Sequence, residues 1–154
     1  MKLSHFFLFA ILTLSLSRGL HAHCQVPCGI YGDELKFGEL EQHVETIAKA
    51  STQLQSYGAK SALTAQDLQQ VARWTSNKES HAAKIIDEAA NYFLAQRIKP
   101  DAEHYAEKLE LLHHIIVFSM KSKQQADPAV AKTLGEKIAA FKRLYLDHDH
   151  THSH

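Results

Sequence analysis

The sequence lacks an excess of charge of either sign. Its 154 residues include 17 lysines and arginines and 17 aspartates and glutamates, so the formal net charge is zero. This balance excludes a nucleic-acid-binding protein that works through bulk positive charge. A hydrophobic fraction of 45% over this length is enough for one domain with a real core, which excludes an intrinsically disordered chain.

The sequence also lacks an apolar run long enough to span a membrane. The run from Phe6 to Leu16 is about ten residues shorter than a bilayer-spanning helix requires, and no second run of that length follows. Lys2 precedes this run, and a polar stretch that ends at Ala22 follows it, which is the pattern of a signal peptide. We therefore expect removal of residues 1–22 and export to the periplasm or the exterior, with no membrane association after processing.

Cysteine is scarce, and its placement is informative. Cys24 and Cys28 are the two cysteines of the chain, and both fall within the first six residues after the expected cleavage site. A disulfide between them would close a very small loop, so it would remove little conformational entropy from the unfolded chain. An exported structural protein with such a disulfide stays an alternative, but the spacing favours another use of the two thiols.

The residues after the expected cleavage site offer a set of metal ligands. A freed His23 has an α-amine with an ordinary pKa of roughly 7.7 to 8.0, together with an imidazole. Cys24 adds a thiolate and a backbone amide, and Cys28 adds a second thiolate after the turn at Pro27. Two nitrogen and two sulfur donors in one plane suit Ni(II) or Cu(II) better than tetrahedral zinc. Because thiolates readily reduce Cu(II), the ligand set favours nickel.

This segment resembles the nickel hook of the nickel superoxide dismutases in the pattern His23-Cys24-x-x-Pro27-Cys28-Gly29-x-Tyr31. The resemblance implies that residues 23–31 bind one nickel ion per subunit and convert superoxide to dioxygen and hydrogen peroxide by Ni(III)/Ni(II) cycling. It implies that the ligands are the amine and axial imidazole of His23, the amide nitrogen and thiolate of Cys24, and the thiolate of Cys28. It also implies a catalytic Tyr31 on the substrate side and a homohexamer of four-helix bundles.

The resemblance also suggests residues that support the metal site. Glu39 lies sixteen residues after His23, where the family carries a glutamate that hydrogen-bonds the axial imidazole. His81 occupies a position where some members place an arginine that buttresses the same imidazole. We expect Glu39 and His81 to orient the ligands from outside the coordination sphere. Lys36 is a candidate for a local positive charge that attracts superoxide.

The remainder of the chain predicts an all-α fold, an antiparallel four-helix bundle over residues 32–146. Apolar side chains recur every three to four residues, and no segment alternates as a strand does. The first helix is expected to run from near Asp33 to near Gly58, and the second from a Thr64–Asp67 capping box to Lys99-Pro100. The third is expected to begin at a cap on Asp101, and the fourth at Pro128. Asn77 is a candidate interruption of the second helix, and Met120 a candidate end of the third apolar stripe.

Residues 147–154 form a histidine-rich tail in which His148, His150, His152 and His154 alternate with small polar residues. Imidazoles at this density suggest an accessory Ni(II) or Zn(II) site, although a solvated end explains them as well. The same tail and hook would suit an exported nickel or copper carrier without catalysis. This carrier is the alternative to the enzyme.

Overall fold

The computed structural model describes residues 33–149, and their side chains as far as Leu146. All the regular structure in this part of the chain is helical, which confirms the predicted all-α four-helix bundle. The expected signal peptide, the hook at residues 23–31 and residues 150–154 lie outside the described part. The helices are α2 (Glu34–Gly58), α3 (Ala65–Asp87), its π-helical continuation η1 (Glu88–Arg97), α4 (Tyr105–Gln124) and α5 (Pro128–Asp149).

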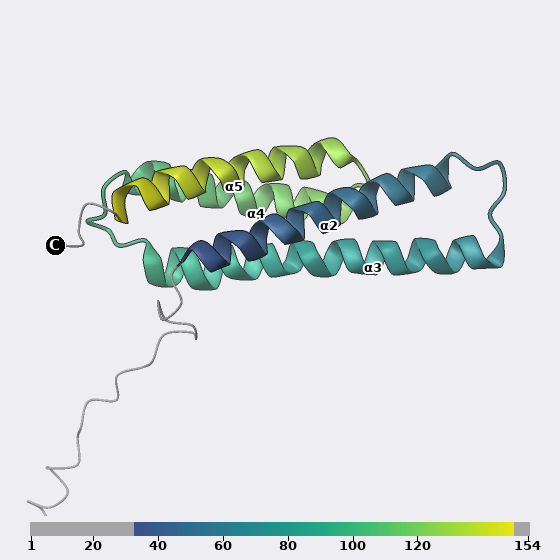
Figure 1. Cartoon of the computed structure of the whole chain (residues 1–154), viewed down its shortest axis with the longest axis horizontal. Helices are drawn as coiled ribbons and strands as arrows, with labels where there is room; N and C mark the ends of the chain where they lie inside the picture. The colour runs from purple at the N-terminus through teal and green to yellow at the C-terminus, as the bar shows by residue number, and fades with distance from the viewer. Residues whose placement is uncertain (1–32, 150–154) are drawn as a thin grey trace, which may run out of the picture.

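The four helices run antiparallel to their neighbours in sequence (Figure 1). α2 packs chiefly against α3 and α5, and α4 packs chiefly against the same two helices. The start of α2 and the end of α5 therefore lie at the same end of the bundle (Figure 1). The expected hook precedes this end of α2, and the histidine-rich tail includes the end of α5.

Local signals account for several of the helix boundaries. The Thr64 side chain accepts a hydrogen bond from the Asp67 backbone N–H, and the Asp67 carboxylate accepts one from the Thr64 N–H, so the predicted capping box is confirmed. Pro128 begins α5, where its missing N–H costs no hydrogen bond. Asn77 does not interrupt α3, which is continuous from Ala65 to Asp87.

The last ten residues of the α3 segment are π-helical, which the sequence pattern did not predict. The Ile98 N–H donates to the Phe93 carbonyl at 3.0 Å, five residues back. Residues five apart therefore lie on one face, and Arg97 is brought beside Tyr92. The π-helix thus determines which side chains meet at this end of the bundle.

Two expectations for α4 were wrong. Asp101 does not cap the helix, because α4 begins at Tyr105 after a cap residue, His104, with a left-handed backbone (φ 54°). The physical reason is that the buried Ile98 holds the end of η1 in the core, so the chain needs two further turns before α4 starts. Met120 is exposed, because the innermost line of α4 instead follows the set Lys108, Leu112, Ile115, Ser119 and Ser122.

Aromatic side chains fill the core where α2 begins. We call four of them the aromatic cluster; their ring centroids lie 5.0 to 5.7 Å apart: Phe37, Phe93, Phe141 and Tyr145. Three of these rings are completely buried, and Tyr145 is 9% exposed. Further along, α5 approaches α2 closely at Gly135, where a Cβ atom would lie 3.2 Å from Val44 Cγ1.

The hairpin between α2 and α3 extends beyond the ends of α4 and α5 (Figure 1). We call residues 52–77 the projecting tip. No residue in this range is fully buried, whereas Ser51 and Lys78 on either side of it are. Leu63 and Leu68 on the tip are 40% and 56% exposed. None of the helices described is long and apolar enough to cross a membrane.

Candidate metal centre

The bundle itself does not offer a metal site. Within the described part of the chain, no three histidine, cysteine, aspartate or glutamate side chains lie close enough together to hold a metal ion. The predicted ligands His23, Cys24 and Cys28, and the neighbouring Tyr31, lie outside the described residues. Residues 23–31 contain both thiols of the chain.

A buried carboxylate lies where this segment joins the bundle. Asp33 Oδ1 accepts hydrogen bonds from the Tyr92 hydroxyl and, at 2.8 Å, from Arg97 Nη2. Asp33 Oδ2 accepts a hydrogen bond from the Tyr145 hydroxyl. Arg97 Nη2 also donates to Tyr92 Oη at 2.9 Å. We call these four residues the Asp33 cluster, and they join α2 to both η1 and α5.

The Asp33 cluster stabilises the ionised carboxylate. Burial favours the neutral acid, but hydrogen bonds from Tyr145 and Tyr92 and the charge of Arg97 outweigh it, so the pKa of Asp33 lies below its ordinary value. The pKa of Tyr92 is raised, first by burial and then by its hydrogen bond to Asp33. Tyr92 therefore stays protonated as a donor, and Asp33 stays charged as an acceptor.

Lys36 does not provide the unpaired positive charge that we expected. Its ammonium group donates to Glu88 Oε1 at 2.9 Å and to Glu39 Oε2 at 3.2 Å. Burial opposes its charged form, but the two carboxylates outweigh burial and raise the pKa of Lys36. Lys36 is thus charged and fully compensated, so it cannot attract superoxide as a free cation.

The structure places the two predicted supporting residues on adjacent helices. Glu39 lies on α2 with its side chain 55% exposed, and His81 lies on α3. No bond joins them directly; instead, His81 Nδ1 lies 3.0 Å from Nδ1 of His43, one helical turn after Glu39 on α2. Burial, followed by the charge of Lys84, lowers the pKa of His81. Burial, followed by the charges of His81 and Lys84, also lowers the pKa of His43. When both rings are neutral, the protonated Nδ1 of one can donate a hydrogen bond to the unprotonated Nδ1 of the other.

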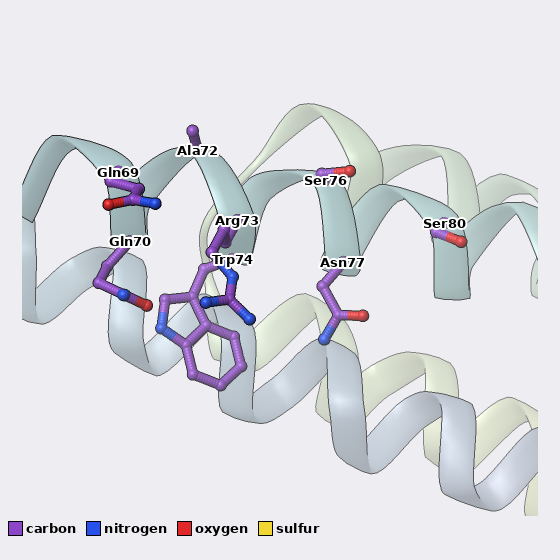
Figure 2. Close-up of a pocket in the computed structure, with 8 residues that line it drawn as sticks. All are labelled: Gln69, Gln70, Ala72, Arg73, Trp74, Ser76, Asn77 and Ser80. Carbon is purple, nitrogen blue, oxygen red and sulfur yellow. The ribbon is translucent and has the colours of Figure 1, made fainter.

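A hollow of about 750 Å³ lies on α3 and is separate from all of these groups (Figure 2). Its lining includes Gln69, Gln70, Arg73, Trp74 and Asn77, which are amide, cationic and indole side chains. It contains no histidine, cysteine or carboxylate, so it has no ligand of the kind that a redox metal prefers. The hollow belongs mainly to the projecting tip.

Sequence reasoning missed most of the supporting groups. The pairing of His43 with His81 was not predicted, although the spacing of four residues between His43 and Glu39 places both on one face of α2. The contacts of Arg97 and Tyr145 with Asp33 could not be predicted, because the partners are separated by 64 and 112 residues of sequence. The π-helix that brings Arg97 to Tyr92 also had no recognisable motif.

Comparison with known proteins gives one match. A family model described as nickel-containing superoxide dismutase matches residues 18–149, a range that includes the expected hook and all the helices. Neither the search of curated proteins nor that of solved structures returned a match.

Proposed function

The chain belongs to the nickel-containing superoxide dismutase family, and from this premise we propose that residues 23–31 form its nickel-binding hook. As a member it is a nickel-dependent superoxide dismutase, an oxidoreductase whose cofactor is nickel. The observation that supports the hook most strongly is that the family match includes residues 23–31, which contain both cysteines, while the bundle offers no metal site within its described residues.

The donor set of the hook fits nickel. His23, Cys24 and Cys28 would hold one ion per subunit, with the α-amine of His23 available after processing. When bound, nickel supplies one-electron chemistry between Ni(II) and Ni(III), so that one superoxide is oxidised to dioxygen and a second is reduced to peroxide with two protons. Thiolate and amide donors increase the electron density on the metal and so favour the higher oxidation state.

Residues near the hook would orient its groups and supply protons. Tyr31 would line the substrate side and carry an exchangeable proton. Glu39 would orient the His23 imidazole, which is supported by its position on the second turn of α2 and by its exposed carboxylate. His81 would act through His43, its neighbour at 3.0 Å. Lys36, the lysine beside Glu39, is paired with two carboxylates, whereas Lys84 acts on both histidines through its charge.

We propose that the enzyme is exported and that processing completes the site. Removal of residues 1–22 would free the amine of His23, whereas a retained Ala22 would convert that amine into an amide. The mature protein would be periplasmic or secreted and would assemble into a homohexamer. The projecting tip supports assembly, because a two-helix extension with exposed Leu63 and Leu68 gains burial when another subunit covers it.

One experiment separates the enzyme from the other two readings. Intact mass and metal content are measured on the mature protein, purified after cells have exported and processed it. The enzyme predicts a chain that starts at His23, two reduced cysteines, one nickel ion and consumption of superoxide. A carrier predicts exchangeable metal without superoxide consumption, and a structural protein predicts a disulfide and no metal.

The thiolates are tested by Cys28→Ser. Loss of an outer-shell partner typically lowers metal affinity or activity by 10- to 100-fold, so loss of a ligand should lower activity by more than about a hundredfold. The helical circular dichroism signal should not change, because the core of the described bundle is formed entirely by residues that follow Asp33. Gln25→Ala, at a hook position without a proposed ligand, is the control and should keep full activity. Retained activity in Cys28→Ser would refute the hook.

A further inference from the structure

Asp33 occupies the cap position of α2 but does not cap the helix. Aspartate is a preferred residue at this position because its carboxylate usually accepts a backbone N–H from the first turn. Here the Asp33 side chain makes no such bond, and both of its oxygens are bound by side chains of η1 and α5. The carboxylate is therefore used to join three segments rather than to complete the helix.

The surrounding contacts fix Asp33 firmly. Its side chain is 10% exposed, and it forms an ion pair with Arg97 at 2.8 Å. The Tyr145 ring that donates to it packs in the aromatic cluster, 5.7 Å from the Phe37 ring and 5.5 Å from the Phe93 ring. The donor hydroxyl thus belongs to a side chain that close packing holds in place. Asp33 is thus joined to the aromatic cluster through the Tyr145 hydroxyl.

Chain length places this anchor close to the proposed metal ligands. Cys28 lies five residues before Asp33, so their Cα atoms are at most about 18 Å apart even in a fully extended chain. Two further buried polar atoms at this end, Arg97 Nε and Glu88 Oε2, have no hydrogen-bond partner among the described residues. They are available to backbone or side-chain groups of the segment that precedes Asp33.

We propose that Asp33 is a positioning residue for the nickel hook. It fastens the carboxyl end of residues 23–32 to η1 and α5, and Arg97 and Glu88 offer further bonds to this segment. An anchor at Asp33 would limit how far Cys28, five residues earlier in the chain, can move from this end of the bundle. This proposal rests on the proposed function for its link to nickel, but the fastening itself is a property of the metal-free chain.

The test uses three variants of the mature protein. Asp33→Asn keeps the size of the side chain and removes its charge, and Tyr145→Phe removes one hydroxyl while keeping the ring. Glu41→Gln is the matched control, because Glu41 Oε1 accepts a bond from Lys142 Nζ at 2.7 Å and so joins the same two helices at an exposed position. Circular dichroism sets a temperature at which every variant is folded.

Two measurements are made at that temperature. Amide hydrogen exchange of the peptide covering residues 24–32 is followed in the metal-free protein, and nickel loss to an excess of chelator is followed in the loaded protein. We expect exchange and nickel loss to be about tenfold faster in Asp33→Asn, because local opening of the anchored segment becomes easier. Tyr145→Phe should show a smaller increase in both rates, and Glu41→Gln should match the unaltered protein.

Unchanged exchange in folded Asp33→Asn would overturn the proposal. If Asp33→Asn does not fold, Tyr145→Phe decides, and unchanged rates there would overturn it equally. Faster exchange over residues 24–32 with unchanged nickel loss would also overturn it, since the anchor would then not act on the ligands. If nickel binding proves insensitive to Cys28→Ser, the proposed function fails, and exchange in the metal-free chain still shows whether Asp33 fastens the segment.

Discussion

The end of the bundle where α2 begins and the projecting tip are packed in opposite ways. At the first end, the aromatic cluster is buried and the Asp33 cluster satisfies a carboxylate with three donors. In the tip, residues 52–77 include no fully buried side chain, and Leu68 is more than half exposed. Both regions are mostly helical, so helix formation by itself does not determine how firmly a segment is held.

This contrast agrees with different tasks for the two regions. A metal hook needs a rigid base, because ligand geometry is lost when the supporting shell moves. A surface that joins subunits can instead leave apolar side chains exposed in the isolated chain, since their burial occurs on assembly. The hook and the assembly remain proposals, whereas the difference in burial is a property of the described residues.

Truncation of a core ring should give the largest difference in stability between the two regions. Phe93 is completely buried between other rings, so Phe93→Ala should lower the free energy of unfolding by about 3 to 5 kcal/mol. Leu68→Ala in the tip should change it by less than about 0.5 kcal/mol, as for other surface substitutions. Urea unfolding of a monomeric preparation measures both values. Equal losses would show that the tip is packed as firmly as the core.

A charge on the tip should affect assembly more than stability. Leu68→Glu places a carboxylate at a position that is 56% exposed, so the isolated bundle should keep its helicity and unfolding midpoint. If the tip is a subunit contact, a buried and unpaired carboxylate there should shift the protein toward smaller species. Sedimentation velocity measures this shift. The control is Lys132→Glu, at an exposed position of α5. An unaltered mass for Leu68→Glu would place the subunit contact elsewhere.

The pair His43 and His81 predicts a smaller, pH-dependent effect. Burial lowers the pKa of both imidazoles below the ordinary value of 6.5, so the unfolded chain binds more protons than the folded chain below that pH. The free energy of unfolding should therefore fall as the pH decreases from about 6.5 toward the lowered pKa values of the pair. His43→Gln should reduce this slope, as measured by urea unfolding at several pH values. An unchanged slope would mean that the pair titrates like exposed histidines.

Removal of the histidine-rich tail should give the smallest effect on catalysis. The end of α5 lies at the same end of the bundle as the start of α2 (Figure 1). Deletion of residues 147–154 should leave the rate per bound nickel unaltered, because the proposed ligands are complete without the tail. Nickel content should fall in cells starved of nickel, as measured by metal analysis. Equal nickel content under starvation would show that these histidines do not collect the metal.

The features that sequence predicted correctly depend on neighbours within one or two helical turns. The Thr64–Asp67 capping box, the start of α5 at Pro128 and the apolar spacing of Phe37, Leu40 and Ile47 are all local patterns. The hook is local as well, since its proposed ligands fall within six residues. For this reason the all-α fold, the family and the nickel cofactor could be read before the helices were placed.

The tertiary structure decided which distant side chains meet. Asp33 contacts Tyr92 and Tyr145 across 59 and 112 residues, and the first of these contacts lies in a π-helical segment without a sequence signature. Packing also buried Ser119 and Ser122 on α4 and left Met120 exposed, because the rotation of a helix is set by its neighbours. Sequence determined the helices and the family, and it predicts the ligands of the hook, because all three depend on short-range pattern. The Asp33 cluster was decided by packing, because its partners come together only when η1 and α5 close around the start of α2.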